Sequence, residues 1–170
     1  MTVLDLSGNQ VGYAISIYKT LKVNKRLIQL NIGKNDITDD SGAKIGKALK
    51  TNRGLQLLNL ERNLIEGKVV IAISDALKVN RSLVELNIMG NKIRYNGAIA
   101  IGDTLKINTG LKVLNLGIIA SKGAKVIGEG LMINKTLKEL NLDDNNIGDV
   151  ISEGIKINKV LEALSLRNWY

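Results

Sequence analysis

The chain has 170 residues, of which 45% are hydrophobic and none is cysteine or histidine. This length allows one continuous core, so we expect a single domain over residues 1–170. The missing residue types remove the commonest general base, the usual zinc ligands and the thiol nucleophile, and we expect no enzyme, no cofactor and no metal. The formal net charge of +8 concerns partners and solubility rather than the fold.

The composition also predicts a location. Without cysteine, a disulfide-stabilised secreted protein is excluded. Residues 1–6 (MTVLDL) already fit the repeat described below, so we expect no signal peptide. No apolar run approaches the ~20 residues of a membrane span. We therefore expect a cytoplasmic protein without a membrane partner.

A pattern recurs along the chain with a period of about 28 residues. The segments Leu27–Ile37, Leu55–Ile65 and Leu83–Ile93 all fit LxxLxLxxNxI, the leucine-rich-repeat signature. Apolar residues that alternate within each unit predict a short strand with these side chains inward. The predicted strands hold the pairs Leu4/Leu6, Leu30/Ile32, Leu58/Leu60, Leu86/Ile88, Leu114/Leu116, Leu140/Leu142 and Leu164/Leu166.

An asparagine follows most of these strands. The residues are Asn9, Asn35, Asn63, Asn91 and Asn145. An amide at this bend can satisfy loop backbone groups that neither sheet nor helix reaches, so we interpret this column as structural. The unit from Leu111 lacks its asparagine, and the unit from Leu137 is short by about one helical turn.

The second half of each unit has helical spacing. The pairs Ile45/Leu49, Ile73/Leu77, Ile101/Leu105 and Ile127/Leu131 each share one helix face. Beside them runs a column of small residues that would let neighbouring helices approach closely, namely Gly46, Ser74, Gly102, Gly128 and Ser152. The first unit has Tyr18 there, which we interpret as partial cover for an open end. Left-handed helix caps are predicted at Asn24, Asn52, Asn80, Asn108, Asn134 and Asn158.

A helix after every strand in a 28-residue unit resembles the ribonuclease-inhibitor-like subclass of leucine-rich repeats, over residues 1–170. The phrase ALKxNxxLxxLNL in Ala48–Leu60 is similar to repeats of NOD-like receptors and of related protist and bacterial proteins. The resemblance implies an α/β solenoid of about six and a half repeats, a curved horseshoe fragment. A parallel β-sheet would line the concave face and α-helices the convex face. The family implies protein recognition, but no residue-specific function carries over.

The concave sheet is the predicted binding surface. A ladder of Asn31, Asn59, Asn87, Asn115 and Asn141 is flanked by positions that vary from unit to unit. We predict that a protein partner, of unknown identity, binds the variable residues Leu57, Glu61, Glu85, Met89, Val113, Glu139 and Asp143. The apolar members would supply contact near the middle of the groove and the acids a polar surround.

The alternative function is a self-assembling structural protein. The predicted strands reach both ends of the sequence without a recognisable capping unit, and exposed repeat ends invite stacking into homo-oligomers. Tyr18, Trp169 and Tyr170 are candidates for a cap or an assembly contact. Trp169 stands where the repeat expects its strand-side asparagine, so it either folds over the last apolar layer or anchors a second subunit.

Two charged features have less specific explanations. The pairs Asp39-Asp40 and Asp143-Asp144 lack the spaced ligands of a calcium loop, and we interpret them as solvated turn acids. Basic residues recur where the helices end, where they complement the helix dipole; an anion-binding stripe is the alternative. Nucleic acid is disfavoured because the chain has no Phe, four Tyr and one Trp for stacking.

Overall fold

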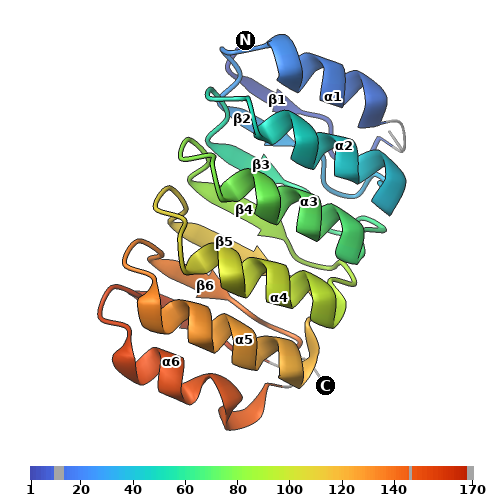
Figure 1. Ribbon diagram of the computed structural model, residues 1–170. Helices are drawn as coiled ribbons and strands as arrows, with labels where there is room; N and C mark the ends of the chain where they lie inside the picture. The colour runs from blue at the N-terminus through green and yellow to red at the C-terminus, as the bar shows by residue number, and fades with distance from the viewer. Residues whose placement is uncertain (10–13, 146, 168–170) are drawn as a thin grey trace.

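The computed structural model describes residues 1–9, 14–145 and 147–167. In these residues one sheet of seven parallel strands follows chain order, and a layer of helices covers one of its faces (Figure 1). The strands are β1 (Val3–Asp5), β2 (Gln29–Asn31), β3 (Leu57–Asn59), β4 (Glu85–Ile88), β5 (Val113–Leu116), β6 (Glu139–Asn141) and β7 (Ala163–Ser165). The helices are α1 (Ala14–Val23), α2 (Asp39–Leu49), α3 (Gly67–Leu77), α4 (Arg94–Leu105), α5 (Ala120–Ile133), the 3-10 helix η1 (Gly148–Ile151) and α6 (Ser152–Ile157). The alternating order confirms the expected solenoid.

The strands pair in one unbroken register. The first inward leucine of every unit is aligned with that of the next, through Leu4, Leu30, Leu58, Leu86, Leu114, Leu140 and Leu164. Because side chains on a strand alternate between faces, this register places all of these leucines toward the helix layer. In the middle of the sheet they are fully buried; Leu86 and Leu114 have an exposed fraction of 0%.

A single hydrophobic core runs between the sheet and the helices. It begins at Ile17 in α1 and continues without a break to Ile151 in η1. The i, i+4 pairs of the helices, such as Ile73 and Leu77, are buried in it as predicted from their spacing. No unit could bury these side chains alone, since each covers the apolar face of the next.

The column of small residues lies where neighbouring helices touch. A Cβ added at Gly46 would lie 2.6 Å from the carbonyl carbon of Ala72 in α3, and one at Gly102 would lie 2.6 Å from the Val126 oxygen in α5. Real Cβ atoms do not approach backbone this closely, so the expected reason for small residues is correct. In both cases, however, the column faces the following helix.

Tyr18, the predicted partial cover for the open end, occupies the position of this column in α1. By analogy with Gly46 and Gly102, we expect its Cβ to lie on the side of α1 that faces α2. The side chain is half-buried against the core. The open N-terminal end instead holds an apolar hollow of about 120 Å³, and Tyr18 is not among the residues that line it: Leu4, Leu6, Ser16, Ile17, Thr20, Leu21, Leu27 and Leu30.

The asparagines after the strands are structural, as predicted. Asn63 is buried, and its Nδ2 donates to the carbonyl oxygens of Ile32 (3.1 Å) and Leu60 (2.8 Å). Its Oδ1 accepts hydrogen bonds from the N–H groups of Asn35 (3.1 Å) and Ile37 (3.0 Å) in the preceding unit. The residue before each of these asparagines has a positive φ of 49° to 69°; these are Gly8, Lys34, Arg62, Gly90 and Asp144.

The asparagines after the helices act differently from our prediction. Asn134 and Asn158 have φ values of −64° and −66° and an extended backbone, so the predicted left-handed cap is wrong. Their side chains do the capping instead. Asn80 donates from Nδ2 to the carbonyl oxygens of Leu49 (2.7 Å) and Asn52 (2.8 Å), and thereby satisfies the end of α2 in the preceding unit.

The two irregular units also keep their joints, the contacts that link each unit to the next. In the unit without a strand-side asparagine, Gly117 is required because a Cβ would lie 2.4 Å from the Asn91 oxygen. The N–H of Ile119 in that unit donates to Asn145 Oδ1 at 2.7 Å. In the shortened unit, η1 runs directly into α6 and Ile151 remains buried.

Candidate partner-binding face

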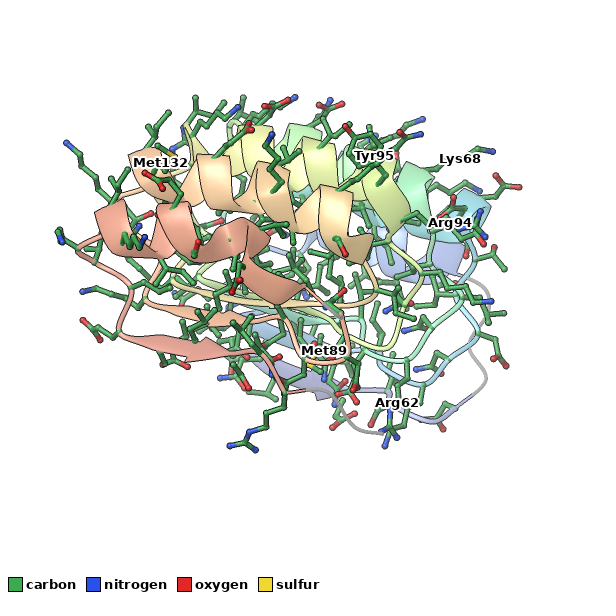
Figure 2. The ribbon with its side chains drawn as sticks, turned by 90° about the horizontal axis from the view of Figure 1, so that it is seen from below. Arg62, Lys68, Met89, Arg94, Tyr95 and Met132 are labelled. Carbon is green, nitrogen blue, oxygen red and sulfur yellow. The ribbon has the colours of Figure 1, made fainter. Side chains whose placement is uncertain are left out.

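The sheet face turned away from the helices, called here the concave face, presents three rows of outward positions. The first row is Val3, Gln29, Leu57, Glu85, Val113, Glu139 and Ala163, and the second is Asp5, Asn31, Asn59, Asn87, Asn115, Asn141 and Ser165. The third row follows two residues later and is Ser7, Gly33, Glu61, Met89, Gly117, Asp143 and Arg167. Figure 2 shows Met89 on this side of the sheet, opposite the helices that carry Tyr95 and Met132.

The register divides the predicted binding residues between the outer rows. Leu57, Glu85, Val113 and Glu139 are aligned on four successive strands of the first row. In this row Glu85 separates the two aliphatic side chains. All four are half-buried except Glu139, which is exposed.

The other three predicted residues, Glu61, Met89 and Asp143, lie in the third row and are half-buried. Met89 is therefore separated from Leu57 and Val113 by the asparagine row. The apolar contacts expected at the middle of the groove are distributed over both rows and do not form one continuous patch.

The asparagine row fixes the backbone of the third row. The Oδ1 of Asn59 accepts a hydrogen bond from the Glu61 N–H at 2.9 Å, and that of Asn87 accepts one from the Met89 N–H at 3.0 Å. Asn141 does the same for Asp143 at 2.8 Å. These bonds hold the chain as it leaves each strand, so the ladder has a structural function that explains its repetition.

Acidic side chains dominate the concave face. The three rows contain five carboxylates (Asp5, Glu61, Glu85, Glu139 and Asp143), and their one cationic side chain is Arg167. Glu61 also pairs with the adjacent Arg62 at 3.3 Å. The charge of this face is therefore opposite to the net charge of +8 of the chain. A surface of one sign attracts partners of the other and raises their rate of encounter.

Two of these carboxylates are held in their ionised form. Partial burial favours a raised pKa for Asp143, but hydrogen bonds from the Ser165 hydroxyl, the Arg167 N–H and Asn141 outweigh it and lower the pKa below its usual value. The pKa of Asp5 is also lowered, chiefly by the Ser7 hydroxyl and then by the Ser7 N–H. The acidic character of the face therefore persists below neutral pH.

Open hollows lie at both ends of the concave face. One of about 260 Å³ lies over β1 to β4 and includes Asp5, Asn31, Leu57, Asn59 and Glu85 in its lining. Another of about 390 Å³ lies over β5, β6 and β7 and includes Glu139, Asn141, Ser165 and Arg167. Leu57, Glu85 and Glu139 thus border recesses into which side chains of a partner would fit.

One acid of each pair in the turns is not merely solvated, which corrects part of our interpretation. Asp39 caps a helix in the next unit: its carboxylate accepts hydrogen bonds from the N–H groups of Glu66 (2.7 Å) and Lys68 (3.1 Å) at the start of α3. Asp143 accepts bonds from the Ser165 hydroxyl (2.6 Å) and the Arg167 N–H (2.7 Å). Both acids therefore link successive units, a role that a single repeat in isolation does not reveal.

Trp169 and Tyr170, the predicted cap or assembly contacts, lie outside the described residues. In the part of the chain that is described, no helix has the length and apolar character needed to cross a bilayer. Nor do the described acidic side chains gather in groups of three or more that could hold a metal ion.

Comparison with known proteins agrees with this architecture. The Leucine Rich repeat family matches residues 1–15, 23–46, 79–102 and 134–155, which together make up half of the chain. The chain belongs to the leucine-rich-repeat family. No curated protein matches it in sequence.

Among solved structures, 59 chains match the fold. One of them is described as Leiomodin-1 Actin-Binding Site 2 (ABS2). It superposes with a TM-score of 0.70 at 23% sequence identity, over 83% of this chain and 88% of that chain. At this level of identity the likeness shows a shared fold.

Proposed function

We propose that this chain is a non-catalytic protein-interaction module of the ribonuclease-inhibitor-like subclass, acting as one domain in the cytoplasm. Its concave face binds a protein partner. The observation that carries the proposal is the acidic concave face of a basic chain, in which carboxylates surround half-buried Leu57, Met89 and Val113. This arrangement fits a partner surface that is basic and partly apolar.

The size of the face supports a macromolecular ligand. Seven strands at the usual spacing of ~4.8 Å give a groove roughly 30 Å long, which accommodates a helix or a small domain. Its hollows are open and border several strands, unlike the enclosed apolar pockets that hold small molecules. A solved domain of the same fold is named for binding actin, which is itself a protein. That name supports the class of ligand and leaves the partner of this chain to be identified.

Substitution on the concave face tests the proposal. After a partner has been captured by pull-down, we expect Leu57→Ala and Met89→Ala each to weaken binding about tenfold, the usual effect of removing an apolar contact of central importance. Isothermal titration of the purified pair measures the change. Ile71→Ala on α3 is the matched control, because Ile71 is an exposed aliphatic residue (41%) on the helix layer. Unchanged affinity in both concave variants would place the binding site elsewhere.

A second candidate function is self-assembly through the ends of the solenoid. The apolar hollow at the N-terminal end favours it, and so do the outer edges of β1 and β7, which pair with no further strand among the described residues. Leu166, just beyond β7, is 40% exposed. A further unit stacked on either end would bury these surfaces.

Light scattering over a concentration series separates the two functions. Self-assembly predicts a mass that grows with concentration, and deletion of Trp169 and Tyr170 would then release folded monomers if these residues anchor the next subunit. If they form a cap, the truncated chain should instead melt earlier. A monomer mass at every concentration would contradict self-assembly and leave the concave-face proposal in place.

A further inference from the structure

A row of exposed aliphatic side chains runs along the edge of the solenoid where the helices end. In five of the six helical units the residue directly before the helix-side asparagine is valine or isoleucine. These residues, called here the aliphatic row, are Val23, Val79, Ile107, Ile133 and Ile157, with exposed fractions of 75%, 55%, 51%, 55% and 43%. Thr51 occupies the position in the second unit. So much exposed β-branched surface at one repeated position needs an explanation.

The hydrogen bonds of the neighbouring asparagines keep this row in line. Asn80 donates to the Asn52 oxygen at 2.8 Å, Asn108 to the Asn80 oxygen at 3.1 Å, and Asn158 to the Asn134 oxygen at 3.0 Å. Asn52 likewise donates to the Asn24 oxygen at 3.0 Å. Each residue of the aliphatic row directly precedes an asparagine of this series, so the row follows the same stacked turns. These turns, which follow the C-terminal ends of the helices, form the left margin of the molecule in Figure 1. The row is therefore a rigid ridge fixed by buried bonds.

Cations border the aliphatic row on both sides. Lys22, Lys50, Lys78, Lys106 and Lys156 stand one residue before it, and Lys25, Arg53, Arg81, Lys135 and Lys159 stand two residues after it. Among the described residues, two of these cations pair with acids: Lys78 with Asp75 and Lys106 with Asp103, each at 2.9 Å. Met132, 40% exposed, takes the place of the lysine in α5 and adds to the apolar surface (Figure 2).

The helix ends explain the cations of this edge but not its aliphatic residues. Arg53 Nη1 donates to the Lys50 oxygen at 3.0 Å, and Arg81 Nη1 to the Leu77 oxygen at 2.9 Å, so both guanidinium groups complement carbonyls at a helix C-terminus. This confirms the dipole explanation for part of the basic edge. It does not explain why valine or isoleucine recurs between the cations, because these side chains neither pack inward nor cap anything.

Aliphatic side chains set between fixed cations match the interface of an anionic bilayer, which places hydrocarbon directly beneath negative headgroups. We propose that this ridge docks the protein on the surface of a membrane that contains anionic lipid. The contact is peripheral and needs no spanning helix, so it revises our expectation that the protein has no membrane partner. It also leaves the concave face free, because the ridge and the outward strand positions belong to different surfaces of the unit.

The same cations would attract other anions, but the aliphatic row favours lipid. Nucleic acid would gain little from it, since bases stack on aromatic rings. An acidic protein would need apolar recesses at the spacing of the repeat, whereas lipid headgroups rearrange around a ridge of any spacing. Nucleic acid and acidic protein are therefore outcomes that the experiment has to exclude.

Vesicle co-sedimentation of the purified chain tests the proposal. We expect binding to phosphatidylcholine vesicles that contain about 30% phosphatidylserine, none to pure phosphatidylcholine, and a decrease as salt is raised. Replacing Lys22, Lys50 and Lys156 by Gln should weaken partitioning about fivefold per cation, and on the order of a hundredfold in the triple variant. The matched control replaces Lys34, Lys68 and Lys92 by Gln. It lowers the net charge by the same amount, but on the opposite edge of the solenoid.

The aliphatic row has its own pair of variants. Replacing Ile107, Ile133 and Ile157 by Ser should abolish most vesicle binding, whereas Thr51→Ile, which completes the row, should strengthen it several-fold. The control replaces three exposed aliphatic residues outside the ridge by Ser. These are Leu64, Ile71 and Ile118, with exposed fractions of 59%, 41% and 53%. Circular dichroism confirms that each variant is folded, and Leu57→Ala on the concave face should bind vesicles normally.

Three results would overturn the proposal. They are no binding to the anionic vesicles, equal losses of binding in the ridge variants and their controls, or unchanged binding when Ile107, Ile133 and Ile157 are replaced by Ser. Stronger binding to polyglutamate or to duplex DNA than to vesicles, lost with the same lysines, would reassign the edge to an acidic protein or to nucleic acid.

Discussion

Asn80→Ala should destabilise the fold by about 3 kcal/mol or more, although it removes only one small polar side chain. Asn80 is completely buried. Its Nδ2 satisfies the carbonyl oxygens of Leu49 and Asn52, and its Oδ1 accepts the N–H groups of Ser82 and Leu83 at 2.8 and 2.9 Å. Alanine would remove the partner of three backbone groups, the Leu49 oxygen and the N–H groups of Ser82 and Leu83, whereas the Asn52 oxygen still accepts from Arg53 Nη1 at 3.2 Å. Each buried polar group that loses its partner costs about 1–3 kcal/mol.

Urea unfolding followed by circular dichroism measures this loss. Asn96→Ala is the control, because Asn96 is exposed on α4 and alanine favours the helix. This variant should be as stable as the unsubstituted chain or slightly more stable. Asn80→Asp keeps the acceptor oxygen but removes the amide donor and buries a charge, and it should be no better than alanine. A small effect of Asn80→Ala would show that water or a rearranged turn replaces the amide.

Leu86→Ala should cost about 2–5 kcal/mol by leaving a cavity in the core. Leu86 lies on the central strand β4 with an exposed fraction of 0%, and it is aligned with Leu58 and Leu114 on the adjacent strands. The surrounding leucines are held by their own strands and cannot close the space. Thermal and urea unfolding would both register the loss.

Val84→Ala is the companion to this experiment. Val84 lies just ahead of the same strand with an exposed fraction of 36%, so its truncation should change stability by less than 1 kcal/mol or so. If Leu86→Ala were as mild as Val84→Ala, the inward register of the strand would be wrong.

The periodic features of this protein were predictable from sequence because they arise within one unit. Leu30 and Ile32 alternate as strand residues do, and Ile45 and Leu49 share a helix face, so each pair identifies its element without knowledge of the neighbours. The seven strands, the helices and the solenoid follow from such patterns. The asparagine after most of the strands was also recognisable, since its bend needs an amide.

Contacts between units were much harder to predict. The direction of the column at Gly46 and Gly102 depends on how the helices stack, which the sequence of one unit does not show. Asn80 resembles a left-handed cap in sequence, but its amide reaches 31 residues back to Leu49. Asp39 likewise resembles an exposed turn acid until α3 is placed beside it.

The binding residues were predicted only as outward positions that vary. Their division into two rows, with Met89 apart from Leu57 and Val113, needed the strand register. The aliphatic row was missed because single exposed valines and isoleucines are common on protein surfaces. An alignment of the units at their helix-side asparagines would have revealed it.

The bonds that Asn80 and its counterparts make across each joint have a consequence for how this array could change in length. Every interior unit satisfies polar groups of the unit before it and leaves equivalent groups for the unit after it. Insertion or deletion of one whole 28-residue unit would therefore recreate every joint. The unit from Leu137, which is shorter by about one helical turn, keeps the same bonds because Asn158 after its helix still reaches Leu131 and Asn134. Gene duplication of complete units could lengthen the array without new stabilising interactions, and the reach of the concave face would grow with it by one strand at a time.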